Sequence, residues 1–272
     1  MSYCLGIQVE EGLVFAADSR TNAGVDSVST FRKVFLFDKP GERVIVVLTA
    51  GNLAVTQEVI SMIDRGLGTD DPERSLFCVG SMFDATKIVG GFLRAVYDRD
   101  AAYFQAHGAE FNASLIVGGQ IQGERPRMFL VYPAGNFIEA SEGTPYFQLG
   151  ETKYGKPILE RVLEPGLGLV HTAKCALVSF DSTIRANISV APPIDLVIYK
   201  TDSFQIAAQL RIRDDDPYFN ELSRHWSEGL RRLFAEAPDP HWSVDATEAP
   251  AAANSRAKTE DIADDTVLEA IT

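Results

Sequence analysis

Residues 1–33 read MSYCLGIQVEEGLVFAADSRTNAGVDSVSTFRK. An apolar segment begins at once, turns at Gly12 and returns as a second apolar segment, Leu13 to Ala17. Two adjacent apolar segments joined by a short glycine turn predict a β-hairpin. The returning strand ends at Asp18, beside the start of the first strand. We therefore expect Ser2 and Asp18 to be neighbours in space.

A lysine completes this set. Lys33 opens a third apolar segment, Val34 to Phe37. If that segment joins the same sheet, its ammonium group reaches the same end as Ser2 and Asp18. A carboxylate beside the lysine would hold it in place.

The second residue suggests a chemistry for this cluster. Ser2 is small, and a small second residue allows a cell to remove the initiator methionine, which would leave Ser2 with both a hydroxyl and an α-amine. A hydroxyl needs a base to become a nucleophile, and an α-amine with a pKa of ~7.7–8.0 can act as that base at neutral pH. A nearby lysine would favour the alkoxide.

Each residue alone also fits an ordinary role. Ser2 fits an efficient start site, Asp18 a turn with a local hydrogen bond, and Lys33 a solvated charge on an edge strand. The prediction of a nucleophile site rests on their combination and spacing near the start of the chain.

Four sequence motifs extend the pattern. They are Ala-Asp-Ser-Arg-Thr-Asn-Ala-Gly-Val-Asp at 17–26, Ser-Thr-Phe-Arg-Lys at 29–33, Thr-Ala-Gly-Asn-Leu-Ala at 49–54 and Gly-Glu-Thr-Lys-Tyr-Gly-Lys-Pro at 150–157. With Ser2, Asp18 and Lys33, they resemble the proteasome-type N-terminal nucleophile hydrolases, and in particular the bacterial ancestral beta-subunit family, Anbu. The resemblance runs from Ser2 to Trp242.

The resemblance implies roles for these residues. Ser2, Asp18 and Lys33 would be the catalytic residues, and Gly51 would form the oxyanion hole. Gly51 lies in a turn between a continuous apolar run and a helical pattern, where a glycine lets backbone N–H groups approach a developing oxyanion. An ordinary helix start fits the same residues.

Two supporting elements of proteasome sites match only in part. For a Gly-Ser-Gly turn before a helix, the chain offers Ser141-Glu142-Gly143-Thr144, in which Thr144 or Ser141 could supply a hydroxyl. For an Arg-Asp-x-x-Ser-Gly stretch, it offers Arg185 and Ser189, with Ala186 at the aspartate position. Asn187 or Asp181 could stand in for the missing carboxylate.

Cys4 is a competing nucleophile. Residues two apart on a strand share a face, so Cys4 is expected to point the same way as Ser2. No histidine or asparagine partner is recognisable, and a small buried hydrophobic residue is the better interpretation.

Composition limits the partners. The chain has 272 residues and a formal net charge of −13, which argues against nucleic acid and anionic membranes as partners. Cys4, Cys78 and Cys175 show no disulfide or metal spacing, so we expect no metal and no cofactor. We expect no leader peptide, no membrane span and a cytoplasmic location.

The order of elements predicts the fold class. Strands, two helices, strands, two helices, strands and a terminal helix indicate an α+β protein with two packed sheets between helix layers. The resemblance implies a four-layer αββα sandwich. We expect a hydrolase domain at 1–242 and an acidic, disordered tail at 243–272, where alanine and acidic residues dominate.

The function expected is that of a proteasome-like peptidase or amidohydrolase using Ser2 on a peptide or amide substrate. Alternatives are a catalytically weak or inactive self-assembling scaffold or binding protein, and an amidase for an unusual non-protein amide. The resemblance also implies a large homo-oligomer, either a ring or an open spiral. In support, the aromatic residues of the expected helix from Ser81 to Gln105 include Phe92, Tyr97, Tyr103 and Phe104. The need for a regulatory ATPase does not follow from the sequence.

Overall fold

The computed structural model describes residues 2–22, 28–108 and 111–242. The tail expected at 243–272 lies outside the described residues, as does part of the motif at 17–26. The first compact unit of the chain ends at Leu230, and a second begins at Arg231.

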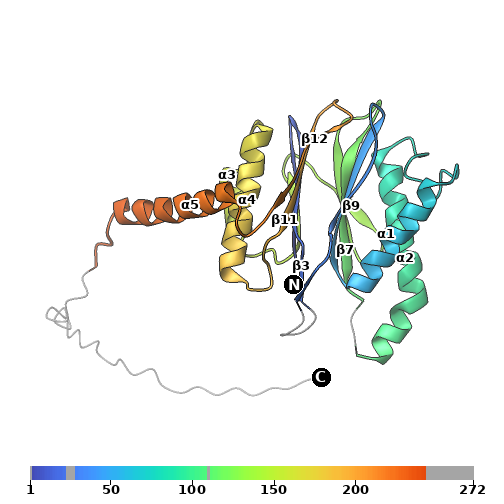
Figure 1. Cartoon of the computed structure of the whole chain (residues 1–272), viewed down its shortest axis with the longest axis horizontal. Coiled ribbons are helices and arrows are strands. Elements are labelled where there is room, and N and C mark those ends of the chain that lie inside the picture. The colour runs from blue at the N-terminus through green and yellow to red at the C-terminus, as the bar shows by residue number, and fades with distance from the viewer. Residues whose placement is uncertain (1, 23–27, 109–110, 243–272) are drawn as a thin grey trace, which may run out of the picture. The chain divides into compact units, whose positions relative to one another are not determined.

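The strands carry the labels of Figure 1. They are β1 (Tyr3–Val9), β2 (Gly12–Asp18), β3 (Arg20–Asn22), β4 (Val28–Thr30), β5 (Val34–Lys39), β6 (Arg43–Gly51), β7 (Ala113–Ile121), β8 (Arg127–Val131), β9 (Phe137–Glu139), β10 (Tyr146–Gly150), β11 (Ile194–Lys200) and β12 (Ile206–Ile212). The helices are α1 (Leu53–Leu67), α2 (Met82–Ala106), α3 (Lys156–Val162), α4 (Leu169–Ala186) and α5 (Pro217–Glu236).

Two antiparallel sheets of five strands form the centre of the first unit. One has the order β10-β1-β2-β11-β12, and the other β5-β6-β7-β8-β9. Helices α1 and α2 cover the outer face of the second sheet, and α3 and α4 cover the outer face of the first (Figure 1). The expected four-layer αββα sandwich is confirmed.

Strand β1 shows why the first sheet is buried on both faces. Its odd-numbered residues, such as Tyr3 and Leu5, pack in the cluster beneath α4, whereas Cys4 packs in the cluster between the sheets. This alternation follows from the two-residue period of a strand. At Gly6 a Cβ atom would lie 2.6 Å from the Met128 sulfur of the other sheet. The sheets therefore approach closely beside the start of the chain.

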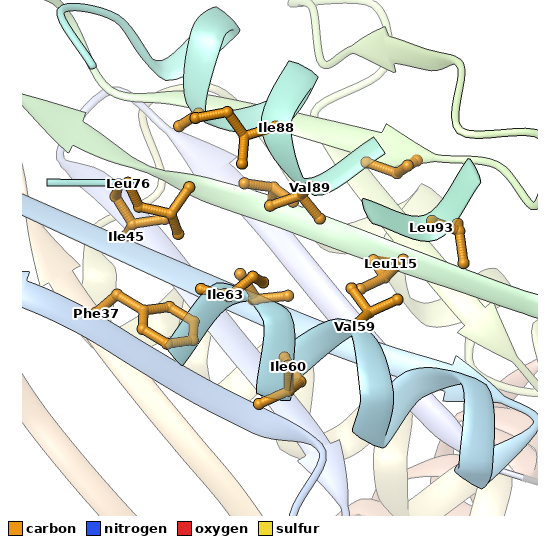
Figure 2. Packing of buried hydrophobic residues seen from close by; sticks show 14 of the residues in the cluster. Phe37, Ile45, Val59, Ile60, Ile63, Leu76, Ile88, Val89, Leu93 and Leu115 are labelled. Carbon is orange, nitrogen blue, oxygen red and sulfur yellow. The ribbon is translucent and has the colours of Figure 1, made fainter. Parts of the chain in front are cut away.

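The helix layer on the second sheet forms by matching apolar faces. In α1, Val55, Val59, Ile60 and Ile63 recur at helical spacing and are buried. Figure 2 shows Val59, Ile60 and Ile63 of α1 facing Ile88, Val89 and Leu93 of α2 and the strand residues Phe37, Ile45 and Leu115, with Leu76 alongside. Burial of these apolar side chains stabilises α1 against the sheet, and this fixes the β6–α1 turn that carries Gly51.

Three strands were not expected from the sequence. Strand β10 was not predicted, because a cluster of turn residues at 141–145 hides its short alternating pattern. The small hairpin of β3 and β4 was also not predicted. Helix α3 begins at Lys156, and at its N-cap, Gly155, a Cβ would meet the Tyr3 and Ser179 hydroxyls at 2.5 and 2.2 Å.

The second unit includes the last residues of α5. The helix ends at Glu236, and the Ala237 amide donates to the Phe234 carbonyl oxygen at 3.3 Å. Across all the residues that the structure describes, no helix has the length and apolar character needed to span a bilayer.

Candidate active site

The buried pair of Asp18 and Lys33 lies at the start of β1. Asp18 ends β2 and Lys33 directly precedes β5, so the pair bridges the two sheets. The Lys33 Nζ lies 2.8 Å from the Asp18 Oδ1, and the two residues are 4% and 0% exposed. The same Oδ1 accepts a hydrogen bond of 2.8 Å from the Tyr3 amide. Asp18 therefore fixes both the lysine and the peptide that follows Ser2.

The electrostatics of the pair follow from its burial. Desolvation raises the pKa of Asp18 above its ordinary value, and the charge of Lys33 opposes that rise. Among the described residues, the Asp18 Oδ2 is buried with no hydrogen-bond partner. Lys33 also donates to the Arg20 carbonyl oxygen at 2.6 Å. An ammonium has three donors, so within the described part of the chain these two bonds leave one donor for a group near Ser2.

The carbonyl of Ser2 is held from the opposite side. The Glu151 amide donates to the Ser2 carbonyl oxygen at 2.8 Å, continuing the pairing of Tyr3 with Gly150. Gly150 has φ +79°, and a Cβ there would lie 1.9 Å from the Ser2 carbonyl oxygen. Only glycine fits this close approach. Ser2 is thus anchored through its carbonyl on one side and through the next amide on the other.

Glu151 is a buried carboxylate whose place in the site the sequence pattern does not indicate. It is 5% exposed, accepts a hydrogen bond of 2.9 Å from the Asn187 side-chain amide, and accepts another of 3.2 Å from the Lys153 amide. The motif at 150–157 contained it, but its place opposite Ser2 depends on β10, which was not predicted. A buried carboxylate therefore lies next to Ser2, a position for which a supporting hydroxyl was expected.

Gly51 occupies the turn between β6 and α1. Its φ is +107°, and a Cβ there would lie 2.1 Å from the Asn112 carbonyl oxygen. The next residue, Asn52, caps α1 by accepting from the Ala54 and Val55 amides at 3.0 and 3.4 Å. The turn therefore combines a close backbone approach with a helix N-terminus, whose partial positive charge favours an anion.

A cavity of about 320 Å³ joins these two glycines. Its lining consists of Ala50, Gly51, Asn112, Ser114, Leu130, Tyr132, Gln148, Leu149 and Gly150. Larger hollows of about 700 and 680 Å³ lie around residues 71–92 and around the far end of β10. The smaller cavity is the one next to the anchors of Ser2, so we take it as the candidate substrate cleft.

The expected supporting residues divide into two groups. Thr144 and Ser141 form a turn that leads into β10, at the end of β1 remote from Ser2. The expectation that this turn precedes a helix and supplies a hydroxyl to the site is wrong, because β10 intervenes. Arg185 pairs with Asp181 at 3.3 Å and donates to the Ser223 hydroxyl. It is therefore turned toward α5.

Asn187 and Ser189 lie near Glu151, whose amide binds the Ser2 carbonyl oxygen. Asn187 caps the C-terminus of α4, and its side chain joins the Ser189 amide, at 2.9 Å, to the Glu151 carboxylate. Ser189 is half-buried and supplies its amide, not its hydroxyl, to this contact. Asn187 thus reaches the surroundings of Ser2 through Glu151.

Cys4 is fully buried behind Ser2. Its Sγ lies 3.4 Å from the Thr49 carbonyl oxygen, and burial raises the pKa of the thiol to about 12. A thiol that stays protonated is a poor nucleophile. Among the described residues, no group of three or more histidine, cysteine, aspartate or glutamate side chains is placed to hold a metal.

Comparison with known proteins assigns this arrangement to a family. No family model matches the chain. The Anbu (ancestral beta-subunit) structure from Yersinia bercovieri is 49% identical with a TM-score of 0.83, covering 89% of this chain and 99% of that one. Anbu from Hyphomicrobium sp. strain MC1 is 49% identical with a TM-score of 0.80, covering 87% and 98%.

Two further relatives extend the comparison. The structure titled as the helical assembly of the Anbu complex from Pseudomonas aeruginosa is 47% identical with a TM-score of 0.83, covering 88% of this chain and 98% of that one. The proteasome subunit beta of Haloferax volcanii is 24% identical over 204 residues, which is 74% of each chain. With nearly half of its residues shared over almost the full length of solved Anbu structures, the chain belongs to the Anbu, or ancestral beta-subunit, family.

Proposed function

We propose that the protein is an amidohydrolase that uses Ser2 as an N-terminal nucleophile after removal of Met1. The Ser2 Oγ attacks the carbonyl carbon of a peptide or amide bond, and its proton passes to the α-amine, directly or through a water. The tetrahedral oxyanion is stabilised at the Gly51 turn. The C–N bond then breaks, the leaving amine takes the proton, and water hydrolyses the acyl ester.

The buried Asp18–Lys33 pair is the observation that carries this proposal. Removing one partner of a buried ion pair costs ~3–5 kcal/mol, because the other charge is then left buried and unpaired. Here the pair is placed at the first strand residue, and Asp18 also binds the Tyr3 amide. A purely structural ion pair has no need to hold the peptide after Ser2. The third Lys33 donor would stabilise the Ser2 alkoxide.

The first experiment measures the intact mass of the purified protein and its labelling by a β-lactone probe. We expect loss of Met1 and a covalent adduct on Ser2, mapped by peptide mass spectrometry. Retention of Met1 would contradict the proposal. Labelling together with hydrolysis of a non-peptide amide, but of no peptide, would assign the substrate to that other amide class.

The second experiment replaces the lysine. Lys33→Met keeps the aliphatic stem and removes the charge, and we expect β-lactone labelling to fall at least ~100-fold, the scale of losing one electrostatic catalytic group. Lys39→Ala, at the far end of β5, where the side chain is 44% exposed, is the control. Thermal melting of both variants separates loss of chemistry from loss of fold. Unchanged labelling in the Lys33 variant would remove Lys33 from the mechanism.

A second candidate function is that of a self-assembling scaffold. The relative from Pseudomonas aeruginosa forms a helical assembly, which supports self-association of this chain. On α2, Tyr103 and Tyr97 are 69% and 42% exposed, whereas Phe92 and Phe104 pack against the core. Exposed aromatic side chains of this kind are typical of interfaces. In both cases we propose a cytoplasmic location, because the three cysteines are few and far apart in the sequence.

A further inference from the structure

Glu151 is a buried carboxylate for which the catalytic scheme above has no use. It is as buried as the Asp18–Lys33 pair, yet within the described part of the chain no lysine, arginine or histidine lies at ion-pair distance from it. Its described contacts are the Asn187 side-chain amide and the Lys153 backbone amide. A carboxylate can accept about four hydrogen bonds, so its acceptor capacity is half used.

The backbone places Glu151 directly beside Ser2. Tyr3 pairs with Gly150, and the Glu151 amide donates to the Ser2 carbonyl oxygen at 2.8 Å. Residues opposite each other on antiparallel strands have Cα atoms about 4.5–5.5 Å apart. The Ser2 nitrogen is one bond from its Cα, and a glutamate side chain spans this separation. The Glu151 carboxylate is therefore within reach of the Ser2 nitrogen.

Removal of Met1 would create a new charge at that nitrogen. Before removal it is a neutral amide, and afterwards it is an α-ammonium. A buried carboxylate without a cation would then gain one, while Lys33 is already committed to Asp18. Resting on the function proposed above, we propose that Glu151 is the counter-ion of the Ser2 α-ammonium and positions the amine beside the hydroxyl.

This role has a cost for catalysis. A neighbouring opposite charge favours the charged form of a group and shifts its pKa by roughly 1–3 units. Glu151 would hold the amine protonated and delay its action as a base, whereas Lys33 acts in the opposite direction. Among the described residues, the other charged groups nearby include Asp18, Lys153, whose amide binds Glu151, and the Asp181–Arg185 pair on the last turns of α4. Glu151 is thus a positioning residue whose charge sets the working pH.

The test compares the pKa of the Ser2 amine in full-length Glu151→Gln and Glu142→Gln. Glu142 is exposed, lies before the far end of β10, and undergoes the same change of charge. The amine is titrated from pH 6 to 10 by its rate of reaction with fluorodinitrobenzene, measured on the N-terminal peptide by mass spectrometry. The same samples are labelled with the β-lactone probe across this range.

We expect the amine pKa to fall by about one unit in Glu151→Gln, with the labelling profile shifted to lower pH by the same amount, and both to be unchanged in Glu142→Gln. Equal amine pKa values in the two variants overturn the counter-ion role, and with Met1 removed and Ser2 labelled they leave the proposed function standing. Retention of Met1 overturns both. If Glu151→Gln does not fold, Glu151→Ala is measured in the same way.

Discussion

Gly150 holds the position of Ser2 through a backbone contact that only glycine permits. Gly150→Ala would place a Cβ 1.9 Å from the Ser2 carbonyl oxygen in a residue with φ +79°. We expect β-lactone labelling of Ser2 to fall at least ~100-fold, because a small misplacement of a reacting group costs that much. Gly143→Ala, where a Cβ meets nothing within 4 Å, should label normally. Equal labelling in the two variants would refute this role of Gly150.

We predict that the buried thiol of Cys4 makes the folded protein less stable at high pH. Burial raises its pKa from 9.0 to about 12, so the folded chain keeps a proton that the unfolded chain releases above pH 9. This contribution to stability is present below pH 9 and is lost as the pH rises toward 12. Tyr3 and Cys175, with pKa values raised to about 12 and about 11, act in the same direction.

Urea unfolding at pH 8 and pH 10 checks this prediction. The free energy of unfolding should be lower at pH 10, and Cys4→Ala should lose about 1 kcal/mol less between the two pH values than the unaltered chain. An identical loss in both proteins would show that Cys4 does not contribute. Cys78, which is exposed, provides the control variant Cys78→Ala.

The sequence identified the charged pair but not its surroundings. Asp18 and Lys33 follow from a hairpin and a strand whose apolar patterns are unbroken, so their meeting could be predicted. Glu151 and Asn187 could not be, because their contact joins the end of an edge strand to the end of α4. Nothing in the local pattern at either residue encodes that long-range contact.

Among the elements, α1 carries the Gly51 turn and depends on its cap. The Asn52 side chain accepts from the Ala54 and Val55 amides, and loss of such a cap costs ~0.5–2 kcal/mol. We expect Asn52→Ala to lower the free energy of unfolding by about 1 kcal/mol and to reduce Ser2 labelling, since the adjacent turn loosens. Asn52→Asp keeps the acceptor and should retain both. Chemical denaturation and probe labelling measure the two effects, and an unchanged Asn52→Ala would argue against the cap.

Element prediction succeeded where periodicity was long. The fifteen residues of α1 and the 25 of α2 repeat an apolar face, and both were predicted. Strand β10 has five residues beside a turn-rich segment, and its stability comes from pairing with β1, which is a tertiary effect. Because that pairing is not visible in the sequence, Ser141–Thr144 remained a candidate for the supporting turn.

For the assembled protein, we predict a homo-oligomer in solution. The layered fold followed from the family resemblance, whereas the sequence alone indicated only an α+β protein with two sheets. Light scattering of the full chain and of a chain ending at Trp242 should give the same mass, above that of a monomer. A monomer at micromolar concentration would exclude assembly, and loss of the oligomer on truncation would make the tail an assembly element. Tyr103→Ser tests the exposed aromatic of α2 in the same measurement.

The described contacts of Ser2 all use main-chain atoms, namely its own carbonyl oxygen and the amide of Tyr3. These main-chain hydrogen bonds depend on the position of residue 2 in the chain and not on its side chain. Threonine or cysteine at position 2 would be held by the same hydrogen bonds, so the side chain at this position can change without a change in the backbone that positions it. Exchange of the hydroxyl for a thiol would then change the reactive group and leave the backbone contacts that position it unchanged.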